Sequence, residues 1–287
     1  MPTILPPLSR RRQYSTRMTE VTQAIPPTSA PHDSTPLPGE SGAPPKRGAP
    51  RGVDRGLSPD EQAVFAYLSD FLTPRRRERF ASVLAQRTRW LTVVLENIYQ
   101  DHNISAVLRT CDAFGVQDVA AIEKEFGFEV NRQIALGTDQ WLTIRRFAGP
   151  NPTVDCLADL KRRGYRVVAT SPRPGSYPIE QLPLDEPVAL VIGNEVDGVS
   201  AETLELADHS VHLPMYGFVE SFNLSVATAL CLQSLSTRLR TQRDDWGLSA
   251  EEKEHLLLDW TRKSIVNPAL LEARFWKQRA ADCVPRG

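Results

Sequence analysis

From residue 91 onward, short runs of Val, Leu and Ile alternate with longer amphipathic stretches. The apolar runs predict strands over residues 91–95, 117–122, 141–147, 166–170, 187–192 and 210–213. The amphipathic stretches predict helices over residues 103–114, 154–164, 200–208 and 223–240. Uniformly apolar strands separated by helices are typical of a parallel sheet with helices on both faces. We therefore predict an α/β domain over residues 91–240.

The segment before this domain has a different composition. Residues 1–56 are rich in Pro, Ser, Thr, Gly and Arg and show almost no apolar periodicity, so we expect a disordered tail. The arginines of this tail give a faint resemblance to an organelle transit peptide, and Met18 is an alternative start to Met1. We favour a dispensable tail.

Helical extensions are predicted on both sides of the domain. Over residues 57–90, Ser58 is the expected cap of one helix, and Thr73-Pro74 begins a second. Over residues 241–287, a capping box at Ser249 starts a last helix that runs to about Lys263. A basic tail follows it, with the cations Arg274, Lys277, Arg279 and Arg286.

The helix predicted to begin at Thr73-Pro74 is unusually basic. Between residues 75 and 89 the only acid is Glu78, and the cations are Arg75, Arg76, Arg77, Arg79, Arg87 and Arg89. The whole chain has 34 Lys and Arg against 35 Asp and Glu, a net charge of -1. A nearly neutral chain that concentrates cations in this way presents a surface for a polyanion. The alternative is an ordinary solvated helix face.

Several functional classes are excluded by missing patterns. No G-x-S-x-G, G-x-x-x-x-G-K-[ST] or G-x-G-x-x-G is present, so the sequence supports neither a hydrolase elbow nor an ordinary nucleotide-binding loop. The cysteines form no C-x-x-C pair and the histidines have no ligand spacing, so we expect no metal. Apolar runs fall far short of the ~20 residues of a membrane helix, so we expect no membrane association.

Three clusters at predicted strand ends carry the candidate chemistry. The first, N-x-x-A-x-x-R-T-x-D-A-x-G, runs from Asn103, at an expected helix N-cap, through Arg109 to Gly115. Taken alone, Arg109 is either a structural salt-bridge partner or a group directed into a cleft. The second, I-G-N-E-x-x-G-V-S, spans residues 192–200. The third, L-P-M-x-G-x-V-E-S-x-N-x-S-V-A, spans residues 213–227 and begins a helix capped by Ser221 or Asn223.

Together and in this order, the clusters resemble motifs 1, 2 and 3 of the SpoU-type RNA 2′-O-ribose methyltransferases of the SPOUT superfamily. The flanking helices resemble those of the TrmH subgroup, which methylates the D-loop guanosine at position 18 of tRNA. The resemblance implies a C-terminal deep trefoil knot, S-adenosylmethionine as methyl donor without a metal, and a homodimer acting on tRNA in the cytoplasm. The basic helix would then bind RNA through Arg75, Arg76, Arg79, Arg87 and Arg89.

The resemblance also assigns site residues. The catalytic positions would be Asn103, Arg109, Glu195, Ser221 and Asn223. The donor site would use Thr170, Gly193, Leu213 and Phe222, the last departing from the family's usual Leu at an apolar wall. A guanidinium is a poor base, so either an RNA phosphate accepts the ribose proton while Arg109 orients it, which we favour, or Arg109 is itself deprotonated.

Two other functions remain open at this point. One is 2′-O-methylation of ribosomal RNA or of another tRNA nucleoside by a SpoU-type enzyme. The other is a catalytically silent RNA-binding protein that has kept the knot.

Overall fold

A computed structural model describes residues 52, 55–173 and 175–282 of the chain. These residues all belong to one compact unit, Pro44–Gly287. The predicted tail over residues 1–56 lies almost wholly outside the described residues, and so does Arg286 of the predicted basic tail. In the described part of the chain, no helix is both long and apolar enough to cross a membrane.

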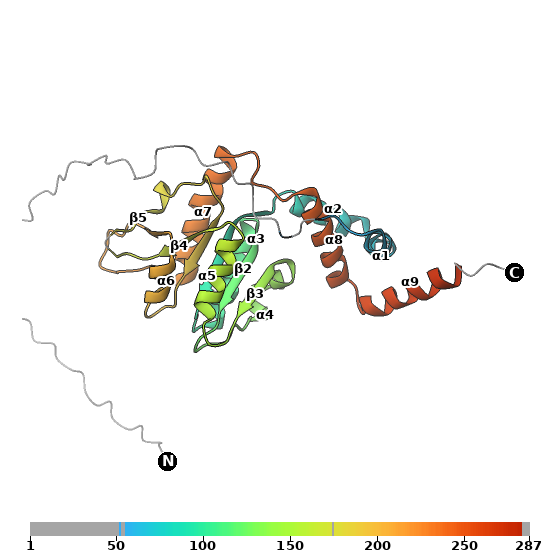
Figure 1. The fold of residues 1–287 in the computed structure, drawn as a ribbon, viewed down its shortest axis with the longest axis horizontal. Coiled ribbons are helices and arrows are strands. Elements are labelled where there is room, and N and C mark those ends of the chain that lie inside the picture. Colours follow the sequence, from blue (N-terminus) through green and yellow to red (C-terminus); the bar gives the residue numbers. More distant parts are fainter. Residues whose placement is uncertain (1–51, 53–54, 174, 283–287) are drawn as a thin grey trace, which may run out of the picture. The chain divides into compact units, whose positions relative to one another are not determined.

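A seven-stranded sheet forms the centre of the unit (Figure 1). Its strands are β1 (Thr88–Glu96), β2 (Val116–Ile122), β3 (Thr143–Phe147), β4 (Arg166–Thr170), β5 (Tyr177–Pro178), β6 (Val188–Ile192) and β7 (His209–His212). They lie in the order β3-β2-β1-β6-β4-β7-β5, and every pairing is parallel. The predicted parallel sheet is confirmed. The missed strand, β5, has only two residues, too few to show an alternating pattern.

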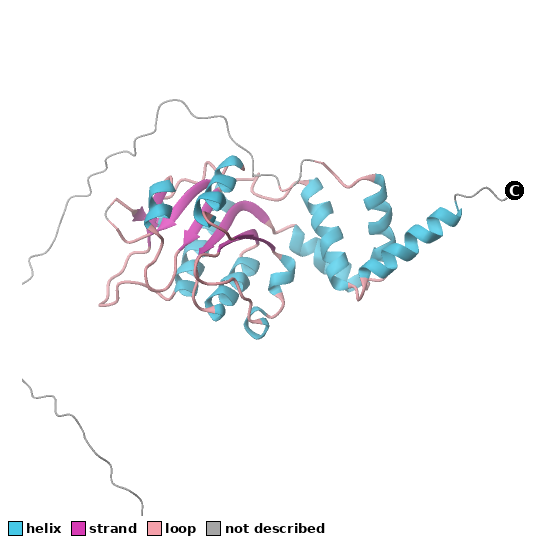
Figure 2. Ribbon diagram, turned by 60° about the horizontal axis from the view of Figure 1, so that its bottom comes forward, coloured by secondary structure: helices cyan, strands magenta, loops and turns pink. Residues whose placement is uncertain are grey.

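Helices cover both faces of this sheet (Figure 2). On one face, α3 (Asp101–Ala113) and α7 (Leu224–Gln242) pack against Val93 and Leu95 of β1. On the other, α5 (Pro152–Arg162) and α6 (Ala201–Leu206) pack on the core that includes Val94. Successive strand side chains point to opposite faces, so a strand that is buried on both sides is mostly apolar, as β6 is throughout.

The short helical segments α4 (Arg132–Ala135), η1 (Thr138–Trp141) and η2 (Ile179–Gln181) lie between strands. The sequence did not predict them. The first helix of the sheet domain also begins earlier than expected: its N-cap is Gln100, so Asn103 lies within the first turn of α3 and is not the cap.

Four helices form the extensions: α1 (Pro59–Ser69), α2 (Pro74–Leu84), α8 (Ala250–Ser264) and α9 (Pro268–Asp282). Capping boxes begin α1 at Ser58 and α8 at Ser249, as the sequence predicted. Trp260 of α8 is fully buried, and its indole N–H donates to the Trp141 carbonyl at 3.1 Å, which attaches α8 to the sheet domain. The segment after Lys263 contains a further helix, α9, that the sequence did not predict, and Arg274, Lys277 and Arg279 of the predicted basic tail lie on it.

Arg87 and Arg89 do not lie on a basic helix. The second helix ends at Leu84, and Arg89 is already part of β1. Both side chains are buried: Arg87 pairs with Asp112, and Arg89 pairs with Asp118 at 3.0 Å and with Glu252 at 2.9 Å. Their predicted role in RNA binding is therefore wrong, since a buried, paired guanidinium is not available to a phosphate.

Candidate active site

The three motif loops leave the same edge of the sheet. They follow β1, β6 and β7, and β4 lies between β6 and β7. All these strands are parallel, so their carboxyl ends lie side by side. This edge is where open α/β sheets bind ligands.

A hydrogen-bonded cluster joins the three loops, and we call Asn103, Glu195 and Asn223 the amide–carboxylate cluster. The Asn103 side-chain amide donates to Glu195 Oε1 at 2.7 Å. The Asn223 amide donates to Asn103 Oδ1 at 3.3 Å. Asn103 is almost completely buried, so these partners fix its side chain. Three of the five predicted catalytic residues are thus brought together.

The loop over residues 193–200 is held at both ends. At its start, Glu195 Oε2 also accepts the backbone N–H of Tyr99 at 3.3 Å. At its end, buried Glu96 of β1 accepts the N–H of Ser200 at 3.0 Å and its hydroxyl at 2.6 Å. Between them, Asn194 Oδ1 accepts the N–H groups of Val196 and Asp197.

Sequence reasoning missed Glu96 as a residue that positions the site. The available signal was a carboxylate directly after the apolar run Val93-Val94-Leu95, at the end of a strand. Lys124 Nζ lies 3.4 Å from Glu96 Oε1 and balances its charge. Such a buried acid needs several partners, because an unpaired buried charge is strongly unfavourable.

Asn223, and not Ser221, is the N-cap of α7. Its Oδ1 accepts the Ser225 N–H at 3.0 Å and the Ser225 hydroxyl at 2.6 Å. The same side chain therefore starts the helix with its oxygen and contacts Asn103 with its nitrogen. Ser221 is exposed and bonds to none of the other described residues.

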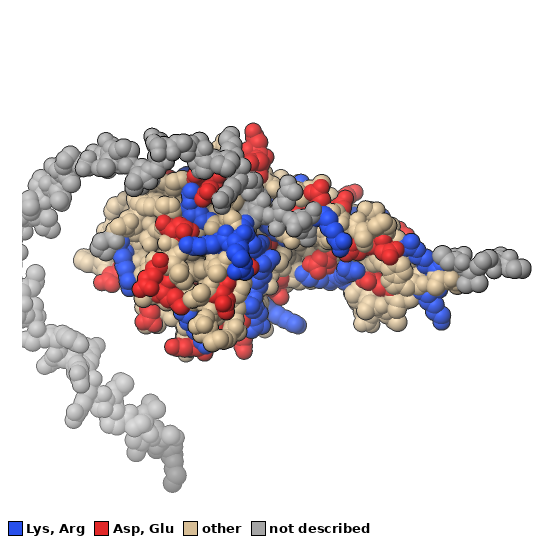
Figure 3. Space-filling view, viewed as in Figure 1, with Lys and Arg blue, Asp and Glu red and all other residues tan. Residues whose placement is uncertain are grey.

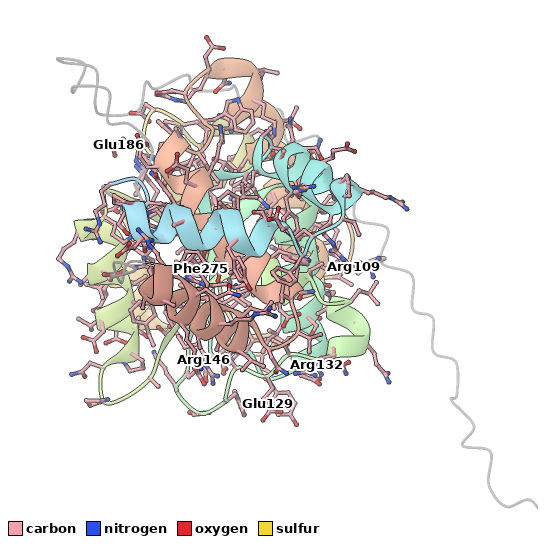
Figure 4. The ribbon with its side chains drawn as sticks, turned by 90° about the vertical axis from the view of Figure 1, so that its right-hand side faces the viewer. Arg109, Glu129, Arg132, Arg146, Glu186 and Phe275 are labelled. Carbon is pink, nitrogen blue, oxygen red and sulfur yellow. The ribbon has the colours of Figure 1, made fainter. Side chains whose placement is uncertain are left out.

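Arg109 lies on α3 but outside the amide–carboxylate cluster. Its side chain is exposed, and among the described residues it has no ion-pair partner. In Figure 4 it lies at the edge of the molecule. The alternative of a structural salt bridge is therefore not supported, and the guanidinium is free to contact another molecule.

The predicted donor residues lie at neighbouring strand ends. Thr170 ends β4, and its hydroxyl donates to the Val191 carbonyl of β6 at 2.9 Å. Gly193 follows β6, and Leu213 follows β7. A Cβ at Gly193 would lie 2.0 Å from the Gly198 carbonyl carbon, so only glycine permits this tight turn.

The loop before α7 has the character of an apolar wall. Tyr216, Phe218, Val219 and Phe222 are all exposed large side chains. Among the described residues, no group of three His, Cys, Asp or Glu side chains is placed to hold a metal ion.

Comparison with known proteins identifies a family over the sheet domain. Residues 90–233 match the family model described as the SpoU rRNA Methylase family. The chain is 40% identical over 205 residues to a tRNA (guanosine(18)-2′-O)-methyltransferase of Borreliella burgdorferi, covering 71% of this chain and 93% of that protein. A Thermus thermophilus protein of the same name is 37% identical, with 67% and 98% covered. The crystal structure of the A. aeolicus TrmH/SpoU tRNA modifying enzyme superposes with a TM-score of 0.61 at 34% identity, with 67% and 98% covered.

Proposed function

The chain belongs to the SpoU rRNA methylase family, and we propose that it methylates the ribose 2′-hydroxyl of guanosine 18 in tRNA, with S-adenosylmethionine as donor. The observation that carries this proposal is the match to relatives of that name over 93% and 98% of their length. The residues of all three motifs support it, because the amide–carboxylate cluster draws one side chain from each.

The donor is already activated, since S-adenosylmethionine supplies a methyl group bound to a sulfonium. Thr170, Gly193, Leu213 and Phe222 would hold it with backbone groups and an apolar wall. Asn103, fixed by Glu195 and Asn223, would orient the ribose or Arg109. Glu195 then acts mainly as a positioning residue, because its two oxygens accept hydrogen bonds from Asn103 of α3 and from the backbone of Tyr99.

The attacking hydroxyl must lose its proton. A guanidinium with its ordinary high pKa cannot accept it efficiently. The exposed and unpaired Arg109 is well suited to grip an RNA phosphate as a bidentate fork. We therefore assign proton acceptance to that phosphate and its orientation to Arg109.

We also propose a homodimer whose active site uses both copies. Two catalytic residues, Arg109 and Ser221, are exposed and lie outside the cluster of their own chain. On α7, Val226 and Leu230 are exposed apolar side chains one turn apart. A second copy that covers this stripe could complete the site.

A deep trefoil knot remains part of the proposal. It would be formed where the loops over residues 193–200 and 213–223 pass one another. The loops follow β6 and β7, two parallel strands that flank β4, so both leave the same edge of the sheet, which supports this placement.

Of the five arginines predicted to bind RNA, only the three on α2 remain in the proposal. Arg75, Arg76 and Arg79 are exposed on this helix. In the face shown in Figure 3, Lys and Arg also gather on the sheet domain. We propose that α2 contacts tRNA phosphates outside the target loop.

Mapping of ribose methylation in tRNA from a strain that lacks this gene tests the proposal. We expect 2′-O-methylguanosine 18 to disappear and to return when the gene is restored. Loss of a ribose methyl from ribosomal RNA, or at another tRNA position, would replace the proposed target. A calorimetric titration that detects no S-adenosylmethionine binding would instead favour a silent RNA-binding protein.

A further inference from the structure

An exposed aromatic side chain lies beside the amide–carboxylate cluster. Tyr99 lies in the loop between β1 and α3, four residues before Asn103. Its side chain is 63% exposed, although its backbone N–H is bound to Glu195 Oε2 at 3.3 Å. One carboxylate therefore fixes both Asn103 and the backbone of Tyr99.

A second set of contacts holds the ring of Tyr99. Phe126 meets it edge to face, with the ring centroids 4.9 Å apart. Phe126 is itself fixed by Asn97, whose Oδ1 accepts the N–H groups of Glu125 at 2.9 Å and Phe126 at 3.1 Å. Asn97 can do this because it adopts the left-handed conformation, with φ of 53°.

The ring of Tyr99 is held on one side only. Edge-to-face packing on Phe126 supports the ring of Tyr99 but leaves much of its surface open. Burying that surface would be favourable, and nothing among the described residues covers it. A supported, open aromatic face beside polar groups suits a planar ligand with polar edges.

We propose that Tyr99 is a stacking platform for the base of the nucleotide whose ribose is methylated. The inference rests on the proposed function, because it takes an RNA ribose to lie at the amide–carboxylate cluster. Proteins bind unpaired RNA bases by stacking them on aromatic side chains. Tyr99 would thus hold the base while Asn103 and Arg109 contact the ribose and its phosphate.

The test combines variants of Tyr99 with two tRNA substrates. One carries guanosine at the target position, and the other carries a ribose without a base there. With the normal tRNA, Tyr99→Ala should lower kcat/KM by about tenfold to a hundredfold, the usual size of one base–aromatic stack. Tyr99→Phe and Tyr99→Trp should stay near the wild-type value, because both keep an aromatic face.

The substrate without a base separates stacking from a loss of loop structure. On this substrate the kcat/KM of wild type should fall below its value on the normal tRNA. Tyr99→Ala should then have the same kcat/KM as wild type, because the base that Tyr99 would stack on is absent. S-adenosylmethionine affinity and melting temperature should not change. Phe71→Ala, which removes an aromatic that is 49% exposed in the turn after α1, is the matched control and should keep wild-type kcat/KM.

Two results would overturn the proposal. One is normal kcat/KM for Tyr99→Ala on the guanosine substrate. The other is an equal loss on both substrates, which would show that Tyr99 supports the loop or the dimer and not the base. If wild type methylates neither tRNA, the proposed function itself fails, and that outcome is distinct from both.

Discussion

At the scale of single residues, Arg109 has no carboxylate partner among the described residues, unlike several arginines near the sheet. Arg87, Arg89 and Arg163 all pair with carboxylates, whereas Arg109 is exposed and unpaired among the described residues. Because the Arg109 guanidinium makes no ion pair with the described residues, it is available to bind a ligand.

Arg109→Ala should therefore remove turnover without weakening the fold. We expect kcat to fall by at least about 10²–10³-fold, as for other groups that act in the transition state. Stability should change by less than about 0.5 kcal/mol, because an exposed, unpaired side chain is lost. Arg109→Lys should also be impaired, since it keeps the charge but loses the fork.

Turnover, donor affinity and melting temperature should be measured on the same samples. Arg162→Ala is the control, because Arg162 is exposed on α5 and makes only a surface pair with Asp159. Near-normal turnover of Arg109→Ala would contradict the catalytic assignment, and a parallel loss of stability would restore the salt-bridge interpretation.

The described cysteines give a prediction about pH. Burial raises the pKa of Cys111, Cys156 and Cys231 to about 12. Below the unfolded pKa of about 8.5 these thiols are neutral in both states, and above it ionisation favours unfolding until about pH 12. Their contribution to stability is therefore present at neutral pH and lost as the pH rises.

Thiol labelling at pH 8 tests this prediction in the Cys283→Ser variant, which removes the cysteine outside the described residues. Native protein should react very slowly, because only the thiolate attacks the reagent. Protein unfolded in guanidinium should expose all of its remaining thiols at once. Rapid labelling of the native state would show that the core around them opens.

At the scale of elements, the buried and the exposed arginines of the basic segment should behave in opposite ways. The triple variant with Arg75, Arg76 and Arg79 replaced by Ala should fold normally and flatten the salt dependence of tRNA binding by about one log–log unit per lost contact. Arg89→Ala should instead cost about 3–5 kcal/mol of stability, because buried Glu252 loses the cation that pairs with it and buried Asp118 keeps only its pair with Arg163.

Chemical unfolding and tRNA titrations over a range of salt concentrations measure both effects. A salt slope unchanged by the triple variant would remove α2 from the RNA surface. Arg89→Ala that is as stable as wild type would mean that the buried pairs contribute little.

Sequence patterns predicted some elements of the fold and missed others. The strand and helix pattern of residues 91–240 predicted the sheet well, because the central strands are buried on both faces and carry runs of apolar residues. Arg87 and Arg89 were misplaced, because charge alone does not reveal a carboxylate brought close by folding. The last extension helix, α9, was missed because few of its side chains are buried, and it packs on α1 chiefly through Leu271 and Phe275.

The site was predictable in part for a similar reason. Asn103, Glu195 and Asn223 were identified by family resemblance, and the structure brings them together. Tyr99 and Glu96 carry no motif, and their roles depend on hydrogen bonds to residues about a hundred positions away.

At the scale of the whole molecule, the predicted tail boundary at residue 56 needs correction. Gly52 N–H donates to buried Glu252 at 2.7 Å, and the Arg55 carbonyl lies 3.0 Å from the His255 ring nitrogen. Removing residues 1–43 should leave stability and turnover unchanged, since that segment has few apolar side chains. Removing residues 1–56 should cost about 1–3 kcal/mol, because a buried carboxylate loses a donor.

Unfolding curves of the two truncated proteins decide this point. Equal stability of both would show that the contacts of Gly52 and Arg55 with α8 contribute nothing. A large loss from the shorter truncation would show that the segment before residue 44 supports the fold.

The central claim is that this chain methylates a ribose hydroxyl of tRNA, and mass spectrometry of nucleosides after reaction in vitro tests it most directly. Purified protein, S-adenosylmethionine and two tRNA transcripts suffice, one with guanosine and one with 2′-deoxyguanosine at position 18. We predict 2′-O-methylguanosine in the first tRNA and no methylated product in the second. A methyl group on a base, or equal methylation of both transcripts, would contradict the account.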